Sequence, residues 1–338
     1  MNDENKTKSH PNSIWYWCSG EKLWYLPYSG TPKRTSKSVW TVSGSFGQLD
    51  IDLYKTSHIL FYGANETTGD LPLLFLSDCA KHSVSISIHR NHVSEPFVFY
   101  RNKTTDRDDL VTAQILHREN TKKSAYIART IIRLQIKQRG YVIPSSFDDT
   151  KLLSSRNVDE VRTIEATASR EYWRLYFKKL GLEGLGRRDD HVVVKALDAT
   201  SHFLSGIMLR WVLSHELSPA HGFIHKSSSY PSLVYDLIEP LRWIPELAVF
   251  QSYLEFGEHR LLERSIERFK QMLDEPIHSE PTRQLVYRRT LIHGQVIALR
   301  HYLNGNMQRY LPPVEELAKE RGRKRAVSYT LPGQIWKK

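Results

Sequence analysis

The chain of 338 residues has few cysteines and no long apolar segment. Its two cysteines, Cys18 and Cys79, cannot build a disulfide framework or a zinc site made of cysteines alone. No uninterrupted apolar run approaches the ~18–20 residues that a membrane-spanning helix needs. The opening residues, MNDENKTKSHPNS, are too polar for a secretory signal peptide. Together these absences predict a globular protein of the cytoplasm without a membrane attachment.

Several familiar active-site motifs are missing as well. The sequence contains no phosphate-binding Walker loop, no glycine fingerprint for dinucleotides and no nucleophile elbow. Disorder over the whole chain is excluded, because hydrophobic residues make up 40% of it and aromatic residues 11%, which is enough for a packed core. The length is typical of roughly two domains.

Positive charge is in excess, with 48 Lys and Arg against 37 Asp and Glu and a formal net charge of +11. Such a balance attracts polyanions through phosphate contacts and the release of counterions. Residues 101–140 hold ten basic against four acidic residues, and residues 319–338 hold seven against one. Each stretch alone could equally be a solvated face or a mobile tail. Because no amphipathic anchor or lipidation signal accompanies them, nucleic acid is favoured over a membrane surface as the partner.

The apolar pattern changes from strand-like to helical near residue 105. Before this point, short aromatic and β-branched runs are punctuated by Gly and Pro. After it, apolar residues recur at helical spacings. We therefore predict the fold class α+β, with a β-rich N-terminal domain followed by an all-α C-terminal domain. The predicted divisions are a polar, partly mobile extension over 1–38, the β-rich domain over 39–104, the helical domain over 105–318 and a basic tail over 319–338.

The expected elements follow from these runs. Strands are predicted at residues 14–17, 22–26, 39–42, 49–53, 58–63, 83–88 and 97–100, with a short helix over 71–79. Later helices are predicted at residues 159–180, 192–217, 232–243, 255–273 and 283–303.

The most unusual segment combines a histidine with two acids on an apolar helix. Ser232 follows a proline and is the expected N-cap of a helix that carries Asp236 and Glu239. These acids lie at i and i+3, so both can face one spot, and their apolar neighbours predict burial. Two buried carboxylates cost several kcal/mol without a compensating cation. His225 is either their partner at a metal site or a structural histidine, and the residues themselves leave both interpretations open.

A histidine with carboxylates suits Mg²⁺ or Mn²⁺ and leaves positions for substrate oxygens. With a basic surface, this chemistry indicates phosphodiester cleavage or transfer. A further acid, Glu165, shares a helical face with Ser169 and Tyr172, and on its own it is typical of a solvated surface acid. Other histidines show no metal-ligand spacing and are interpreted as structural, namely His191, His202, His215 and His221.

At these residues the sequence resembles the CRISPR-associated endonuclease/integrase of spacer acquisition, the universal CRISPR adaptation protein family. Three segments carry the resemblance: IEATASREYW over 164–173, SPAHGFIH over 218–225 and SLVYDLIE over 232–239. The two acids of the third segment fall eleven and fourteen residues after His225, as they do in the family. Weaker similarity extends the match to about residues 40–250.

The resemblance implies a β-rich N-terminal domain, a helical catalytic domain and a metal-dependent reaction on DNA. Glu165, His225 and Glu239 are implied as ligands of Mg²⁺ or Mn²⁺. Asp236 is implied as a catalytic acid that supports the metal or the DNA strand. In the helix before the histidine, Asp198 is retained.

The same helix departs from the family at two positions. Ser201 and Ser205 stand where members often have an Asn and an aromatic residue, which puts the fine positioning of a DNA end in doubt. Contacts to the DNA backbone are predicted from charge rather than from a motif, at Arg129, Arg133, Lys137 and Arg139.

The implied activity is the insertion of short DNA fragments, called spacers, into a CRISPR array. The 3′-hydroxyl of the fragment would attack a phosphodiester at the end of a repeat. The implied partners are double-stranded DNA, both as spacer precursor and as CRISPR repeat, a second copy of the chain in a homodimer, and the small companion CRISPR-associated adaptation protein. Two alternatives are a transposon-type integrase of the same family and a non-catalytic DNA-binding scaffold that retains the fold.

Overall fold

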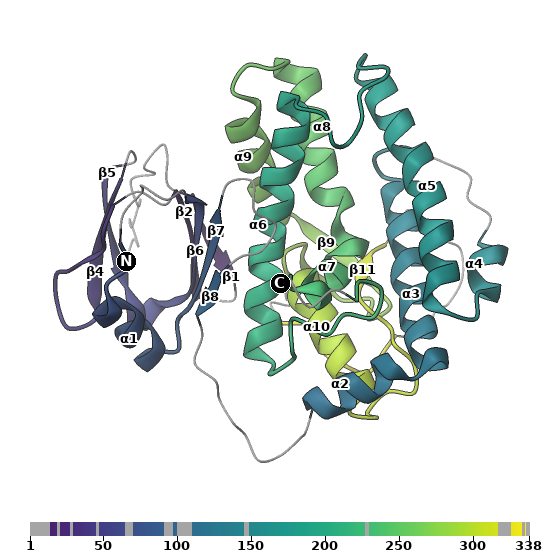
Figure 1. The fold of residues 1–338 in the computed structure, drawn as a ribbon, viewed down its shortest axis with the longest axis horizontal. Coiled ribbons are helices and arrows are strands. Elements are labelled where there is room, and N and C mark those ends of the chain that lie inside the picture. Colours follow the sequence, from purple (N-terminus) through teal and green to yellow (C-terminus); the bar gives the residue numbers. More distant parts are fainter. Residues whose placement is uncertain are drawn as a thin grey trace. The chain divides into compact units, whose positions relative to one another are not determined.

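In the computed structural model the chain divides into two compact units, Met1–Thr104 and Thr105–Lys338 (Figure 1). A β-rich unit precedes a helical one, which confirms the predicted fold class in outline. The structure describes residues 14–18, 21–27, 30–44, 47–64, 70–90, 97–99, 110–144, 149–226, 230–316, 326–332 and 335.

The N-terminal unit contains a five-stranded sheet in the order β1-β2-β6-β7-β8. Strands β2, β6 and β7 are parallel, and the outer strands are antiparallel to their neighbours. The strands of this sheet are β1 (Ile14–Cys18), β2 (Glu21–Pro27), β6 (Thr56–Ala64), β7 (Ser85–Arg90) and β8 (Phe97–Phe99). A second, antiparallel sheet contains β3 (Lys33–Arg34), β4 (Val39–Gly44) and β5 (Gly47–Asp52). The remaining elements are the 3₁₀ turn η1 (Leu53–Lys55) and the helix α1 (Leu73–Lys81).

One core joins both sheets and α1. Alternate residues of β6, Ile59 and Phe61, belong to this core because successive side chains of a strand point to opposite faces. Trp40 from β4 packs edge-on against Phe75 from α1, with ring centroids 5.0 Å apart. Cys79 is also buried in this core, as a small apolar residue.

The prediction that residues 1–38 form an extension outside the β-rich domain is wrong for the described part of that range. Strand β2 pairs with β6 in the middle of the sheet. Trp24 and Leu26 are only 5% and 0% exposed, and the Trp24 indole donates a hydrogen bond to Thr56. Burial of these two apolar side chains outweighs the polar character of the surrounding sequence. Residues 1–13 lie outside the described part of the chain.

The C-terminal unit is mainly helical and also contains a small sheet that the sequence did not predict. Strands β9, β10 and β11 form it in the order β10-β9-β11, all antiparallel. The helical elements are α2 (Leu110–Glu119), α3 (Thr121–Arg139), α4 (Thr150–Ser154), α5 (Val158–Lys179), α6 (Val192–Ser214), α7 (Ser232–Ile238), η2 (Glu239–Leu241), α8 (Trp243–Phe256), α9 (Leu261–Leu273) and α10 (Thr290–Leu303). The strands are β9 (Pro276–Glu280), β10 (Leu285–Tyr287) and β11 (Val314–Glu315).

Two predicted helices are interrupted in the structure. The helix expected over 232–243 ends at Ile238, because Pro240 lies within a 3₁₀ turn that begins at Glu239 and redirects the chain into α8. The helix expected over 283–303 starts only at Thr290, since β10 occupies residues 285–287. Short apolar runs fit a strand as well as a helix turn, which is why periodicity failed here.

Helix α6 is the apolar centre of the helical unit and packs against α7, α8, α9 and α10. Its length and composition would allow it to cross a membrane. Most of its apolar window is nevertheless buried inside the unit, which is the pattern of a core helix.

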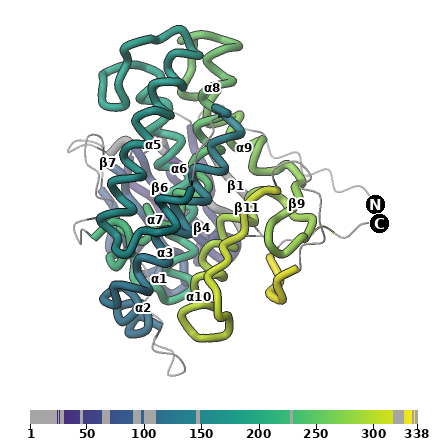
Figure 2. The backbone as a smooth tube through the Cα atoms, turned by 90° about the vertical axis from the view of Figure 1, so that its right-hand side faces the viewer, coloured from purple at the N-terminus to yellow at the C-terminus, as the bar shows by residue number. Residues whose placement is uncertain are grey.

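Part of the predicted basic tail packs onto this unit. Tyr329 and Leu331 are 7% and 1% exposed, and the Tyr329 hydroxyl donates to the carbonyl of Leu311 over 2.7 Å. The described residues 326–332 lie beside β9, where the amide of Val327 donates to Pro281 (Figure 2). These residues are therefore part of the fold, while residues 317–325 of the region lie outside the described part.

Candidate active site

One cavity of about 610 Å³ brings together the residues that the sequence singled out. It lies between α3, α5, the segment before α7, and η2. The residues that matter for its chemistry are Arg162, Glu165, His225, Glu239 and Arg242. The three predicted metal ligands, which are up to 74 positions apart in sequence (165 to 239), thus face one space.

Glu165 reaches the cavity from α5. This helix starts cleanly because the Asn157 side chain accepts a hydrogen bond from the amide of Glu160 over 2.9 Å. Oε1 of Glu165 accepts a hydrogen bond of 2.6 Å from the Ser169 hydroxyl one turn further on. The Glu165 side chain is half-buried, so it is not the freely solvated acid that its local sequence indicated.

His225 is held by Asp236, the fully buried acid of α7. Asp236 Oδ1 lies 2.7 Å from Nδ1 of His225 and also accepts from the His225 amide over 3.1 Å. Its Oδ2 accepts from the amides of Phe223 and Ile224. Asp236 is not among the described residues that line the cavity. It therefore acts on the cavity through the loop 222–225 and the imidazole rather than by direct contact.

The contact with Asp236 determines how the His225 ring is used. With Nδ1 donating to a carboxylate, Nε2 is the nitrogen that carries the lone pair in the neutral ring. Burial lowers the pKa of His225, but the hydrogen bond to Asp236 and the charges of Asp236 and Glu239 raise it more, so the net pKa is raised. The imidazole is thus a fixed group with Nε2 available to the cavity.

The backbone around this loop leaves no room for larger side chains. A Cβ on Gly222 would lie 2.7 Å from the carbonyl oxygen of His225 and 2.8 Å from Oδ2 of Asp236. The Gly222 amide donates to the Ser232 hydroxyl over 2.9 Å, and that hydroxyl donates to Ala220 over 2.8 Å. The predicted N-cap role of Ser232 is therefore wrong: Pro231 holds the cap position, and the hydroxyl ties α7 to the loop.

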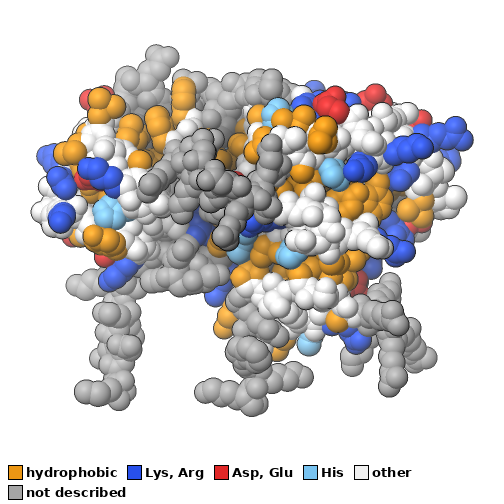
Figure 3. All heavy atoms as spheres, turned by 90° about the horizontal axis from the view of Figure 1, so that it is seen from below, with side chains coloured by type: hydrophobic (Ala, Val, Ile, Leu, Met, Phe, Trp, Pro, Cys, Tyr) orange, Lys and Arg blue, Asp and Glu red, His pale blue; other side chains and the backbone are white. Residues whose placement is uncertain are grey.

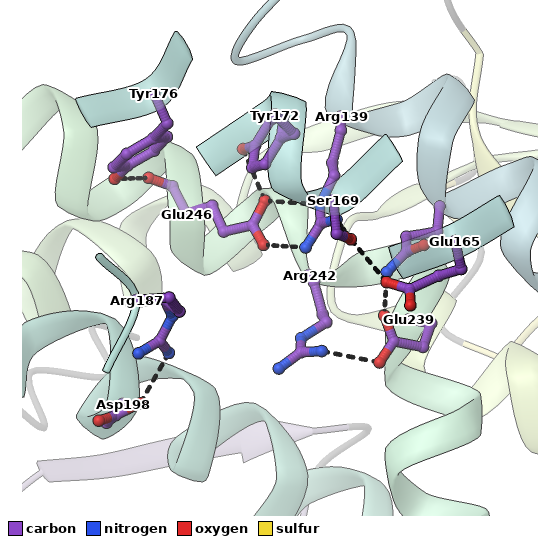
Figure 4. Close-up of polar contacts among 11 residues, drawn as sticks. Arg139, Glu165, Ser169, Tyr172, Tyr176, Arg187, Asp198, Glu239, Arg242 and Glu246 are labelled. Carbon is purple, nitrogen blue, oxygen red and sulfur yellow. Dashed lines mark hydrogen bonds and ion pairs between the residues drawn. The ribbon is translucent and has the colours of Figure 1, made fainter. Parts of the chain in front are cut away.

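Glu239 is 4% exposed and is compensated by protein groups. Its Oε1 pairs with Arg242 over 2.7 Å, and its Oε2 accepts from the side-chain amide of Gln135. Glu165 and Glu239 lie at the same side of the site in Figure 4. Among the described residues, no group of three or more His, Cys, Asp or Glu is close enough to hold a metal ion as it stands. The predicted ligands share a cavity without forming a preassembled cage.

Arg139 is misassigned as a DNA contact. It is 4% exposed and forms a two-pronged ion pair with Glu246, at 2.8 and 3.2 Å. Tyr172 donates to the same carboxylate over 2.7 Å, and Arg139 also donates to Ser169 over 2.9 Å (Figure 4). A guanidinium enclosed in this way cannot reach a phosphate.

The other three predicted DNA contacts lie away from the candidate metal ligands. Arg129 and Arg133 line a second cavity of about 710 Å³. Arg129 donates to backbone carbonyls, including that of Ser155, and Arg133 pairs with Asp149 over 2.6 Å. Lys137 pairs with Glu280 over 3.7 Å. Helical spacing places this face of α3 opposite the face that carries Gln135 and Arg139.

Ser201 and Ser205, the two residues that depart from the family pattern, lie on α6. Ser205 is 5% exposed, and its hydroxyl donates to the carbonyl of Ser201 over 2.9 Å. Asp198 pairs with Arg187 over 2.6 Å, and Arg187 lies over the ring of Trp173. None of these residues is among the described residues that line the first cavity.

Sequence reasoning missed several groups that organise the site. Gln135 and Arg242 contact Glu239, Arg162 lines the cavity, and Glu246 holds Arg139. In its local sequence, each of these four resembles an ordinary surface residue. From the sequence, only the shared helical face of Glu165 and Ser169 can be predicted. The others depend on contacts between segments far apart in the chain.

The fold and the cavity define a class of protein: a β-rich unit joined to a helical unit in which carboxylates and an imidazole line one cavity. A family model described as "CRISPR associated protein Cas1" matches residues 39–253. The chain therefore belongs to the Cas1 family of CRISPR-associated proteins, and the predicted resemblance is confirmed.

Relatives agree with this assignment. The chain is 32% identical over 100 residues to "CRISPR-associated endonuclease Cas1 1" of Rhodospirillum rubrum, a match that spans 28% of this chain and 31% of that relative. It also resembles a solved structure of a CAS1 protein from Thermotoga maritima, with a TM-score of 0.68 at 20% identity, covering 85% of this chain and 98% of that one. A structure titled "Casposase bound to integration product" gives a TM-score of 0.69 at 20% identity, with 84% and 92% covered. The structural matches show a shared fold.

Proposed function

We propose that this protein is a metal-dependent DNA endonuclease/integrase that inserts short DNA fragments into a CRISPR array. The 3′-hydroxyl of the fragment attacks a phosphodiester at the end of a repeat. The observation that carries this proposal is the cavity shared by Glu165, His225 and Glu239, in which Asp236 fixes the imidazole. Family membership supports the same activity.

The residues present fit a divalent metal ion. The carboxylates of Glu165 and Glu239 and the imidazole of His225 face the cavity, and the Nδ1 contact of His225 with Asp236 is the outer support that metal-binding histidines usually have. Glu165, His225 and Glu239 would hold Mg²⁺ or Mn²⁺. The ion would supply Lewis-acid stabilisation of the charge on the transferred phosphoryl group.

The chain's own residues contribute position and charge. Arg242 pairs with Glu239 at the cavity, and its guanidinium, which has further N–H donors, would bind a phosphate oxygen of the DNA. Arg162, which is exposed at the cavity, is placed to meet the DNA backbone. Asp236 keeps the His225 ring oriented, and it does so from the protein interior without contacting DNA.

Arg129, Arg133 and Lys137 are proposed to contact DNA outside the reacting end. They project from α3 on the face opposite Gln135, so a strand in the active-site cavity and DNA on these residues would lie on different sides of one helix. Figure 3 shows Lys and Arg side chains gathered along one edge of the helical unit. Such an edge suits backbone contacts that do not depend on sequence.

The proposed partners are double-stranded DNA, as spacer precursor and CRISPR repeat, a second copy of the chain, and the small companion adaptation protein, all in the cytoplasm. Structures of similar fold are titled as a Cas1–DNA complex and as a Cas6-RT-Cas1–Cas2 complex, with TM-scores of 0.56 and 0.69. Those titles describe the relatives, and they support the same classes of partner for this chain.

A transposon-type integrase is the second candidate, because the casposase is among the similar folds. The two functions share their chemistry and differ in the DNA that receives the fragment. Repeat-bearing DNA as the preferred target supports the CRISPR function, whereas preference for mobile-element ends supports the alternative. A scaffold without catalysis would bind DNA and join nothing.

The test is an integration assay on supercoiled plasmid that bears CRISPR repeats, with Mg²⁺ or Mn²⁺, with and without the companion protein. Wild-type protein should join fragments to the plasmid, and Glu165→Ala should not. Glu171→Ala is the matched control, because it removes a mostly exposed carboxylate from the same helix, where Glu171 pairs with Arg174. Equal joining by Glu165→Ala would contradict the site.

A further inference from the structure

We propose that Ser169 is a positioning residue for Glu165, and that the buried ion pair between Arg139 and Glu246 determines the direction in which Ser169 donates. This inference rests on the proposed function, because it concerns how a proposed metal ligand is oriented. It starts from a continuous chain of contacts that joins the protein core to the cavity (Figure 4).

The chain crosses three helices. Glu246 lies in the first turn of α8, Arg139 is the last residue of α3, and Ser169 and Glu165 lie one turn apart on α5. Arg139 Nη1 is 2.9 Å from Ser169 Oγ, which is 2.6 Å from Glu165 Oε1. Each contact has good hydrogen-bond length.

The chemistry of arginine fixes the direction of every bond in this chain. A guanidinium has only donors, so the Ser169 oxygen must accept from Arg139. The single hydroxyl proton of Ser169 is then free to donate, and the Glu165 carboxylate is the acceptor it faces. Donation from a charged group also polarises the hydroxyl and strengthens the next bond.

The anchor of the chain is rigid. The side chains of Arg139 and Glu246 are 5% and 6% exposed. Tyr172 donates to Glu246 Oε2 over 2.7 Å, and its ring lies 4.4 Å from the Arg139 guanidinium. Burial and the neighbouring Glu246 charge raise the pKa of Tyr172 well above its usual range, so its hydroxyl stays a donor. The ion pair therefore cannot swing toward solvent and keeps one orientation.

The consequence for Glu165 is a defined geometry. One carboxylate oxygen, Oε1, is bound to Ser169, and this fixes the rotation of the group. The second oxygen is left for the cavity. A ligand that is already oriented loses less conformational freedom when it binds a cation, which is the general effect of such outer-sphere hydrogen bonds. Ser169 thus orients Glu165 as Asp236 orients His225.

The experiment compares Ser169→Ala with Ser169→Thr, which keeps the hydroxyl, in the full-length protein. Mn²⁺ binding is measured by isothermal titration calorimetry, and thermal melting is measured alongside. Ser169→Ala should weaken Mn²⁺ binding roughly 10–100-fold, the usual cost of losing an outer-sphere partner, while Ser169→Thr should stay near wild type. Thr167→Ala is the matched control, because Thr167 is exposed on the same helix and its hydroxyl donates to the Thr163 carbonyl.

The outcomes separate this inference from the proposed function. Mn²⁺ binding by Ser169→Ala equal to that of wild type overturns the positioning role and leaves the proposed function intact. The role is also overturned if Ser169→Thr loses as much affinity as Ser169→Ala while both melt like wild type. If wild-type protein itself binds no Mn²⁺, the proposed metal site fails, and the inference fails with it.

Discussion

Asp236 and His225 form a carboxylate–imidazole pair in which Oδ1 of the fully buried acid lies 2.7 Å from Nδ1 of the partly exposed ring. The same carboxylate accepts three backbone amides of the loop 223–225. One fully buried acid therefore holds both the loop and the ring that the loop carries. The shape of the cavity depends on this residue even though it lies outside it.

Asp236→Asn should destabilise the helical unit and abolish strand transfer. The new side-chain amide at position 236 would turn an NH₂ group toward N–H donors that now face a carboxylate. Buried donors would therefore be left unpaired, at a cost of about 1–3 kcal/mol each. Urea unfolding measures the loss. Asp198→Asn, on exposed Asp198, should cost much less, and similar losses for both variants would contradict the assigned role.

Gly222→Ala should destabilise the loop because its Cβ would meet backbone oxygen of His225 at 2.7 Å. We expect a loss of about 1–3 kcal/mol in the free energy of unfolding, as for overpacked sites. Gly186→Ala is the control, because its new Cβ would meet only the Asp189 side chain, at 3.2 Å, and that side chain can move. A stable Gly222→Ala protein with normal DNA joining would show that the loop has another conformation.

Replacing Arg139 and replacing Arg133 should have different effects, although both residues lie on α3. Arg139→Ala leaves Glu246 buried and unpaired, which should cost about 3–5 kcal/mol of stability. Arg133→Ala should leave stability nearly unchanged and weaken DNA binding, with the slope of affinity against salt reduced by roughly 1. Fluorescence anisotropy over a salt series, together with urea unfolding, distinguishes the two. An unchanged salt slope for Arg133→Ala would remove this residue from the proposed DNA contacts.

His215 and His293, whose Nε2 atoms lie 2.6 Å apart, should make the helical unit sensitive to acid. Burial lowers the pKa of His215 to about 4 and that of His293 to about 3, with nearby positive charges and the partner ring adding to the effect. The folded state therefore binds these protons at a lower pH than the unfolded state, whose histidines titrate near pH 6.5. The stability contributed by the neutral pair is present above pH 6.5 and is lost as the pH falls from there toward 4.

His293→Phe tests this dependence, since a phenyl ring can keep the stacking on Trp211. The variant should lose less free energy of unfolding between pH 7 and pH 5 than the wild type, by up to about 1.4 kcal/mol per pH unit for one proton. Equal losses in the two proteins would show that the pair does not control acid sensitivity.

Features carried by neighbouring residues could be predicted from the sequence. The change from strand-like to helical periodicity and the grouping of His225, Asp236 and Glu239 are visible within short windows. The different roles of Asp236 and Glu239 are not visible in this way. Asp236 faces the loop, whereas Glu239 lines the cavity, because α7 ends at Ile238 between the two acids and Glu239 begins the 3₁₀ turn η2.

Long-range contacts set the limit of sequence reasoning. In the sequence, Arg139 is one of several basic residues in a positively charged stretch. Only its contact with Glu246, 107 positions away, shows that it forms an ion pair in the core. Trp24 falls within the predicted extension over 1–38, yet its strand, β2, pairs with β6 in the middle of the sheet. The amide of Gln135 meets Glu239 across a separation of 104 residues. No local pattern carries any of these contacts.

The most direct measurement is the joining of a labelled DNA fragment to repeat-bearing supercoiled plasmid in Mn²⁺, with fragments that end in a 3′-hydroxyl or a 3′-deoxy terminus. The proposed function predicts a covalent product only from the 3′-hydroxyl fragment, lost with a chelator and with Glu165→Ala, and kept with Glu171→Ala. Joining that is equally efficient with 3′-deoxy ends, or that survives both the chelator and Glu165→Ala, would contradict it.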